Sequence, residues 1–185
     1  MTDGGYTVSP LVRRYLVGVG FSSLGIGLTL PFLMVYLHDV RGVSTLTVGL
    51  VLAWMALVTL VMDGPTGVLV DRYGPGPILV VSLVITAISV TGYGMVEQTW
   101  QAFAVGTAAA IGNSGLHGPG NAMVASLVPV EHRQHVYGLQ FALLNLGIGL
   151  GGLMSAAIVD TDRASTFELL YLVSGFPAML AAVVL

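Results

Sequence analysis

The sequence contains no cysteine and no lysine. Without cysteine, the chain can form neither disulfides nor thiolate metal sites, and it has no cysteine nucleophile. Charged residues of any kind are also scarce: they make up 8% of the 185 residues, against about 25% in a soluble domain. So sparse a pattern forms no basic patch for nucleic acid, and the net charge of −3 is too small to indicate a strongly charged partner.

Hydrophobic residues, in contrast, account for 55% of the chain, and the mean hydropathy is +0.90. They gather in six uncharged runs, at 15–38, 42–62, 73–96, 98–130, 134–159 and 169–185. A helix needs about 20 apolar residues to cross the hydrocarbon core, whereas a barrel strand needs only about 9–11. The runs therefore predict an all-α integral membrane bundle with six transmembrane helices, approximately at 12–37, 45–70, 77–96, 101–127, 134–159 and 167–185.

The arginines between the runs orient this bundle. With an even number of spans, both ends of the chain lie on one side, and four of the six arginines fall there, namely Arg13, Arg14, Arg72 and Arg133. By the positive-inside rule, this favours a cytoplasmic N-terminus. Arg13 and Arg14 also resemble the start of a signal peptide, but the apolar run after them is too long for one and five more runs follow.

A short motif recurs in the first and the fourth predicted helix. Residues 27–31 and 115–119 both read G-L-x-x-P, at the same depth in the first helix of a three-helix set. Helices interrupted by Gly and Pro at matching positions are typical of transporters built from two inverted repeats. The motif therefore favours two inverted three-helix repeats. The alternative, that Gly and Pro are simply frequent in membrane helices, stays open.

The turn after the second helix carries the most specific pattern. Residues 67–74 read G-V-L-V-D-R-Y-G, which resembles the G-x-L-a-D-R-x-G signature of the major facilitator superfamily. Residues 23–32 resemble the first-helix pattern of its drug:proton antiporter branch, and residues 129–133 resemble its P-x-x-x-R turn. The resemblance implies that 1–185 is the six-helix N-terminal half of a twelve-helix transporter, without the C-terminal half, in a bacterial plasma (inner) membrane. It implies no enzyme, cofactor or metal.

A physical role can be expected for four residues of this turn. Gly67 is expected to let the second helix approach a neighbour closely, and Gly74 to permit a left-handed turn. Asp71 suits the positive end of another helix, and Arg72 can pair with carboxylate or lipid phosphate. The resemblance implies that these residues, with Arg133, form a gating loop that holds the two halves in the outward-open state.

Three departures from the family pattern weaken the assignment to the antiporter branch. Residues 75–77 read P-G-P where basic residues usually follow the signature, residues 98–130 contain no arginine, and residues 147–152 keep glycines but lack the proline of the fifth-helix pattern. The superfamily resemblance does not depend on these positions.

Polar residues inside the apolar runs predict the substrate cavity, because such residues usually face a bundle interior or an aqueous cavity. Asn113, His117 and Asn121 repeat every four residues along one face of the fourth helix. On the first helix, polar positions repeat every seven residues. In the family, the first and fourth helices line the cavity. The full set of candidates is Ser22, Thr29, Phe32, Tyr36, Asn113, His117, Asn121, Gln140 and Asn145. The alternative is that these side chains only join helices.

Proton coupling needs a titratable group within reach of the cavity, and the spans offer two candidates. His117 is of the type that changes charge within the physiological range, and a structural histidine is the alternative. Asp63 shares a helix face with Gly67 and Asp71, so it can couple protons or can extend the gating loop and pair with Arg133.

The resulting expectation is a secondary transporter that exports hydrophobic or amphipathic small molecules across the lipid bilayer by alternating access. A carrier of sugars, organic anions or other metabolites is the alternative within the superfamily. The chain is expected to need its missing half or a second copy, and to be inactive alone. An alternative of another class rests on residues 112–115, G-N-S-G, which resemble the G-x-S-G of intramembrane rhomboid proteases. Ser114 would then need a histidine base, and residues 167–185 contain none.

Overall fold

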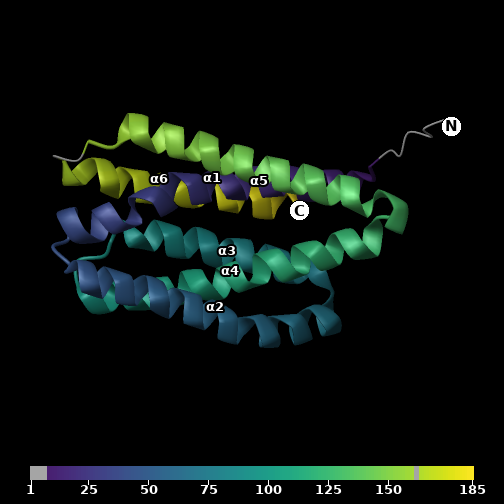
Figure 1. Ribbon diagram of the computed structural model, residues 1–185, viewed down its shortest axis with the longest axis horizontal. Coiled ribbons are helices and arrows are strands. Elements are labelled where there is room, and N and C mark those ends of the chain that lie inside the picture. The colour runs from purple at the N-terminus through teal and green to yellow at the C-terminus, as the bar shows by residue number, and fades with distance from the viewer. Residues whose placement is uncertain (1–7, 161–162) are drawn as a thin grey trace.

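The computed structural model describes residues 8–160 and 163–185, and helices account for nearly all of them. The helices lie side by side along the long axis of the molecule (Figure 1). The elements are α1 (Pro10–Val35), continued by the π-helical turn η1 (Tyr36–Val40), α2 (Thr45–Tyr73), α3 (Pro75–Tyr93), α4 (Thr99–Leu127), α5 (Val130–Ile158) and α6 (Ala164–Val184). The all-α bundle predicted from the uncharged runs is therefore confirmed.

The helix ends follow from local sequence. The Ser9 hydroxyl accepts a hydrogen bond from the Val12 amide at 3.4 Å, and the Ser44 hydroxyl accepts one from the Thr47 amide at 3.2 Å. Both serines thereby satisfy amides that the first turn of a helix leaves unpaired. Pro129 precedes α5, which begins four residues before the predicted start at 134, because residues 131–133 form its first turn instead of a loop.

Five of the six helices have the length and apolar composition needed to cross a membrane. The exception is α4, which at 29 residues is as long as α2 and α5 but carries Asn, Ser and His side chains in its middle. Its length and its position between α2 and α3 (Figure 1) make it a member of the same bundle. The least apolar helix is thus supported by two neighbours.

The pattern of helix contacts divides the chain into two related sets. The first helix of the first set, α1, packs mainly against α5 and α6 of the second set. The first helix of the second set, α4, packs mainly against α2 and α3 of the first set. The remaining large contact joins α3 to α6. Exchanging the first three helices with the last three leaves this pattern unchanged, and α1 and α4 run in opposite directions (Figure 1). Such contacts are what the two inverted repeats expected from the G-L-x-x-P motif would produce.

Glycines set the distance between several of these helices. A Cβ atom added at Gly151 of α5 would overlap the Leu24 carbonyl oxygen of α1, and one at Gly147 would lie 2.6 Å from the Ser23 Cβ. On α4, a Cβ at Gly112 would lie 2.9 Å from the Thr86 amide nitrogen of α3. Small residues allow such close approach in membranes, where helix association depends on packing contacts.

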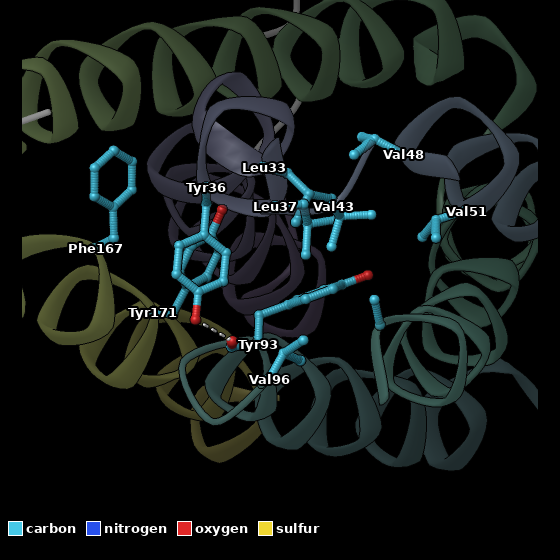
Figure 2. Close-up of a cluster of buried hydrophobic side chains, with 11 residues drawn as sticks. Leu33, Tyr36, Leu37, Val43, Val48, Val51, Tyr93, Val96, Phe167 and Tyr171 are labelled. Atoms are coloured by element: carbon cyan, nitrogen blue, oxygen red, sulfur yellow. Dashed lines mark hydrogen bonds between the residues drawn. The ribbon is translucent and has the colours of Figure 1, made fainter. Parts of the chain in front are cut away.

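Buried side chains gather at the two ends of the bundle. One group, the aromatic cluster, contains Tyr36, Tyr93, Phe167 and Tyr171 (Figure 2), and the rings of Tyr36 and Tyr171 are 4.8 Å apart between centroids. The other group is mostly aliphatic and lies at the end of the bundle where α1 begins. Its buried members are Val12, Tyr15, Leu16, Leu79, Met123, Val124, Val128 and Val136. The middle of the bundle, between these clusters, contains the cavities described next.

Candidate functional site

A groove of about 450 Å³ runs between α2 and α4. We call it the α2–α4 groove, and its lining consists of Thr59, Asp63, Thr66, Gly67, Val70, Asp71, Asn113, Ser114, His117, Gly118, Pro119 and Ala122. Asp63, Gly67 and Asp71 are four residues apart, so they form one face of α2. The structure therefore brings together Asp63 and His117, the two residues predicted as proton-coupling candidates.

Side-chain hydrogen bonds connect the two walls of this groove. The Trp54 indole N–H donates to the Thr107 hydroxyl at 2.8 Å, and the Thr59 hydroxyl donates to the Ala110 carbonyl at 3.4 Å. Further along, the hydroxyls of Thr66 and Ser114 are 3.2 Å apart. These bonds span the α2–α4 interface, where close glycine contacts are absent on the α2 side.

The same contacts account for Ser114, the residue of the protease alternative. Its hydroxyl donates to the Ile111 carbonyl at 2.8 Å and bonds to Thr66. No hydrogen bond described between residues 8 and 160 joins Ser114 to His117. Ser114 thus has the contacts of a residue that joins helices, and it lacks the base contact that an activated nucleophile requires.

Two smaller cavities lie on the other side of α4. One, of about 90 Å³, is lined by Ser22, Thr29 and Asn113 among mostly apolar side chains. The other, of about 50 Å³, is lined by Ser22, His117 and Gln140. Asn113 and His117 each line one of these cavities as well as the α2–α4 groove. The polar face of α4 is therefore a wall shared by all three spaces.

The polar groups around the smaller cavities differ in whether they have partners. The Thr29 hydroxyl donates to the Gly25 carbonyl at 3.0 Å and the Ser22 hydroxyl to the Val19 carbonyl at 3.1 Å, so both are satisfied within α1. The Thr86 hydroxyl and the Gln140 side-chain carbonyl are buried without a hydrogen-bond partner among the described residues. Sequence reasoning missed Thr86, since nothing distinguishes one threonine in an apolar helix from another.

Tyr36 and Phe32, predicted to line the cavity, lie in the packed end of the bundle instead. Tyr36 is fully buried, and its hydroxyl donates to the Tyr93 carbonyl at 2.9 Å. Phe32 meets the edge of Phe167 at 6.4 Å between ring centroids. The seven-residue spacing along the first helix put Tyr36 on the face of Ser22, but this helix end packs against α3 and α6, and neither Tyr36 nor Phe32 belongs to the lining of the cavities described above.

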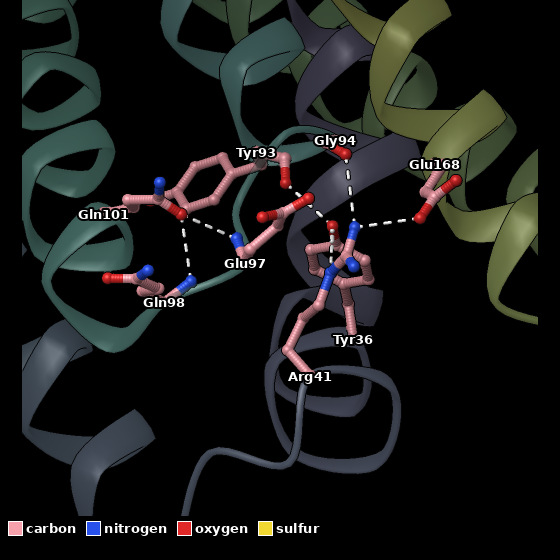
Figure 3. Close-up of polar contacts among 8 residues, drawn as sticks. All are labelled: Tyr36, Arg41, Tyr93, Gly94, Glu97, Gln98, Gln101 and Glu168. Atoms are coloured by element: carbon pink, nitrogen blue, oxygen red, sulfur yellow. Dashed lines mark hydrogen bonds and ion pairs between the residues drawn. The ribbon is translucent and has the colours of Figure 1, made fainter.

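Arg41 joins this end of α1 to two other helices. Its Nε donates to the Tyr36 hydroxyl at 2.9 Å, and one terminal nitrogen donates to the Glu168 carboxylate at 2.9 Å and to the Gly94 carbonyl at 3.3 Å (Figure 3). Burial lowers the pKa of the Arg41 guanidinium, but the hydrogen bond to Tyr36 and the charge of Glu168 outweigh burial and hold that pKa above its usual value. Arg41 therefore stays charged and fixes the aromatic cluster.

The turn between α2 and α3 is built on Gly74. This residue has φ +83°, ends α2 and directly precedes Pro75, the first residue of α3. A left-handed φ at this point is what the turn was expected to need, and glycine adopts it without steric cost. Next to it, the Arg72 guanidinium lies 5.2 Å from the Tyr73 ring centroid, in cation–π geometry.

Gly67 departs from its predicted role. A Cβ atom added there would meet nothing within 4 Å, so α2 approaches no neighbour closely at this residue within the described chain. Gly67 instead widens the α2–α4 groove that it lines. The close approach expected of it occurs at Gly112, Gly147 and Gly151.

Comparison with known proteins identifies the architecture. The family model described as Major Facilitator Superfamily matches residues 15–185. The chain belongs to the Major Facilitator Superfamily. It thus belongs to a family of multi-pass membrane transporters, as residues 67–74 indicated. A solved structure, the bacterial homologue of the iron transporter ferroportin in its outward-facing state, superimposes with a TM-score of 0.80 at 18% identity, over 100% of this chain and 47% of that one.

Two bacterial relatives within the Major Facilitator Superfamily are similar in sequence. The uncharacterized MFS-type transporter YqjV of Bacillus subtilis (strain 168) is 22% identical over 160 residues, which cover 86% of this chain and 39% of YqjV. The quinolone resistance protein NorA of Staphylococcus aureus (strain N315) is 28% identical over 137 residues, covering 71% of this chain and 35% of NorA. The chain therefore spans less than half the length of these relatives.

Arg133, in the superfamily-like P-x-x-x-R turn, has a clear structural position. Its guanidinium donates to the carbonyl oxygens of Val128 and Ala125 at the end of α4. A cation at this end satisfies carbonyls that the last turn leaves unpaired and complements the helix dipole. Among the described residues Arg133 forms no ion pair with Asp63, and its guanidinium is bound to the end of α4 instead.

Two further residues predicted to line the superfamily cavity are exposed. The Asn145 side-chain amide donates to the Phe141 carbonyl of its own helix at 2.7 Å, and the Asn121 main-chain carbonyl accepts a bond from the Tyr137 hydroxyl at 3.2 Å. Asn121 lies one turn after His117 on the same face of α4 and is not part of the groove lining. Their role in substrate binding stays a prediction.

Proposed function

We propose that this chain is the N-terminal half of a secondary active transporter that exports hydrophobic or amphipathic small molecules in exchange for protons. In this proposal, the N-terminus is cytoplasmic in a bacterial plasma (inner) membrane, and the α2–α4 groove belongs to the transport pathway. Its position in a Major Facilitator fold and the name of one relative, a quinolone resistance protein, support this function.

The observation that carries the proposal is that Asp63 and His117 face the same groove from two different helices. Asp71 and Asn113 line it as well, so its polar wall contains acids, an amide and an imidazole, with no arginine. Ionisable groups inside a membrane are expensive and mark ion or substrate pathways. A carboxylate and an imidazole on one groove can take up and release a proton while a substrate passes.

The substrate class follows from the rest of the lining. The cavity of about 90 Å³ is mostly apolar and is lined by the unpartnered Thr86 hydroxyl, and the unpartnered Gln140 carbonyl lines the neighbouring cavity of about 50 Å³; each can bond to a polar atom of a substrate. A buried polar group without a partner costs about 1–3 kcal/mol, so a substrate that supplies the bond gains affinity. Apolar walls with a few polar groups suit an amphipathic molecule. Among the described residues, the groove lining has two acids and a histidine but no arginine, which disfavours organic anions.

Transport requires a second wall. The groove lies on a face of α2 and α4 that carries no further helix of the described chain, so alternating access needs the C-terminal half of a longer product or a second copy of this chain. Because the chain spans 39% of YqjV and 47% of the ferroportin homologue, a C-terminal half is the partner we favour.

The test is ethidium uptake into inside-out vesicles that contain the product of the complete gene, with the vesicle interior acidified. We expect uptake driven by the pH gradient, because protons then leave as ethidium enters. His117→Gln and Asp63→Asn should each abolish the dependence on pH. His135→Gln and Glu131→Gln are matched controls, since both residues are exposed at the start of α5 and outside the groove.

Two outcomes would count against the proposal. Uptake by His117→Gln and Asp63→Asn with the wild-type dependence on pH would remove these residues from proton coupling. Ethidium uptake that is absent from wild-type vesicles, while a sugar or another metabolite accumulates, would favour the alternative carrier.

A further inference from the structure

A second groove lies between α1 and α5, and its chemistry is the opposite of that between α2 and α4. It measures about 450 Å³, within the range of about 300–1,000 Å³ for small-molecule sites. Four leucines of α5 form one wall, and Val17, Phe21 and Leu24 contribute to the other. Arg13 is the only charged residue of the lining and lies at one end.

This α1–α5 groove faces away from the transport cavities. A helix turns about 100° per residue, so Leu24 lies about 200° around α1 from Ser22, which lines the cavities next to α4. Arg13, Val17 and Leu24 are four and seven residues apart, so they lie on this same far face of α1. In a membrane-spanning bundle, a face turned away from the polar pathway contacts lipid.

The length of the groove matches one leaflet of the bilayer. From Arg13 to Leu24 the helix rises about 16 Å at 1.5 Å per residue, and the hydrocarbon core is about 30 Å thick. Arg13 lies in the first turn of α1, near the level of the headgroups, and Leu24 lies near the bilayer centre. The groove is thus charged at the membrane surface and apolar down to the midplane.

The charge at its end has no counter-charge in the described part of the chain. The Arg13 side chain is exposed and forms no ion pair with residues 8–160 or 163–185, and the groove lining contains no acid. A guanidinium binds phosphate through two parallel hydrogen bonds. A second copy docked on this face would bring another Arg13 and supply no negative charge from the groove.

We propose that the α1–α5 groove is a binding site for one anionic phospholipid, with the phosphate on Arg13 and an acyl chain along Val17, Phe21 and Leu24. The site shares no residue with the α2–α4 groove. The headgroup selects negative lipids by charge, and the apolar wall binds any acyl chain.

The charge is tested by native mass spectrometry of the purified product of the complete gene after incubation with phosphatidylglycerol or phosphatidylcholine. Arg13→Gln should lower the affinity for phosphatidylglycerol about fivefold, the value of one basic residue near an anionic membrane surface, and should leave phosphatidylcholine unchanged. Arg14→Gln is the matched control, because Arg14 is the next residue and lies outside the groove lining.

The apolar wall is tested by filling it. Gly20 lines the groove, and a Cβ added there meets nothing within 4 Å, so Gly20→Leu should occupy the groove without displacing α5 and should lower retention of both lipids. Gly149→Leu adds the same side chain to open space elsewhere on α5. Val17→Trp fills the groove from another position should Gly20→Leu lower the helix content.

The proposal is overturned by any of three results. These are equal phosphatidylglycerol affinity of Arg13→Gln and Arg14→Gln, equal lipid retention by the groove-filling variants and Gly149→Leu, or a dimer that Gly20→Leu dissociates while lipid retention stays unchanged. The last result would assign the groove to a second copy of the chain.

Discussion

The α1–α5 and α4–α2 pairs occupy equivalent places in the two three-helix sets, yet different contacts hold them together. Between α1 and α5, Gly147 and Gly151 bring the two backbones into contact. Between α4 and α2, the Thr66–Ser114 bond and two similar bonds span the interface, and the α2 glycines face open space. The groove beside α1 and α5 is apolar apart from Arg13 at its end, whereas the groove between α2 and α4 contains two acids and a histidine.

This difference shows how a repeated architecture can separate stability from function. Contact between backbones leaves little space for polar side chains and allows little sliding, so α1–α5 serves as the rigid pair. Helices that are joined by side chains stay further apart, and polar interhelical bonds contribute only about 0.6 kcal/mol each on average. The pair with the weaker contacts is the one that can contain ionisable groups and a substrate.

The largest effect is expected where the backbones touch. Gly151→Leu should lower the free energy of unfolding by about 3 kcal/mol, because the new side chain must displace the Leu24 carbonyl region of α1. Gly149→Leu, on the open side of α5, should change it by less than about 0.5 kcal/mol. Thermal and denaturant unfolding in detergent micelles measures both. Equal effects of the two variants would contradict the rigid α1–α5 contact.

A smaller effect is expected for the bond between α2 and α4. A double-mutant cycle of Thr66→Val and Ser114→Ala should give a coupling energy of about 0.6 kcal/mol. Replacing Ser114→Ala by Ser126→Ala provides the control, since the Ser126 hydroxyl bonds only to the Met123 carbonyl of its own helix, and the coupling should then vanish. A coupling above about 2 kcal/mol would make this interface as rigid as α1–α5.

The smallest effect is expected at Gly67. Because an added Cβ meets nothing within 4 Å, Gly67→Ala should leave the unfolding midpoint of the chain unchanged or raise it slightly. The same unfolding experiment, carried out beside Gly151→Ala, tests whether the two glycines differ as described. A loss of stability at Gly67 similar to that at Gly151 would restore the close helix approach predicted from the sequence.

Patterns of a few residues predicted much of this arrangement. The uncharged runs located the helices, and the four-residue spacings of 63, 67 and 71 and of 113 and 117 identified residues that do share the α2–α4 groove. Such spacings work because a helix repeats every 3.6 residues whatever it packs against. They apply within one helix only.

Contacts between helix ends were beyond such reasoning. Arg41 and Glu168 are 127 residues apart, and their pairing depends on how α1 and α6 meet. Asp63 was the partner considered for Arg133 from the sequence. Arg133 instead donates to main-chain carbonyls at the end of α4, and a sequence does not show which carbonyl a side chain will reach. Both Gly67 and Gly151 are glycines in apolar helices, so the sequence does not distinguish them. Only the position of the neighbouring helix leaves space beside Gly67 and none beside Gly151.

The contacts of α1 also determine when, during synthesis, this helix can complete its packing. Its partners α5 and α6 begin at Val130 and Ala164, so the ribosome adds about 120 residues after the start of α1 before α5 emerges. At about 5–20 residues per second this takes roughly 6–24 s. During that time α1 is inserted without its partners, whereas α2 waits only for α4. The first helix synthesised is therefore among the last to complete its packing.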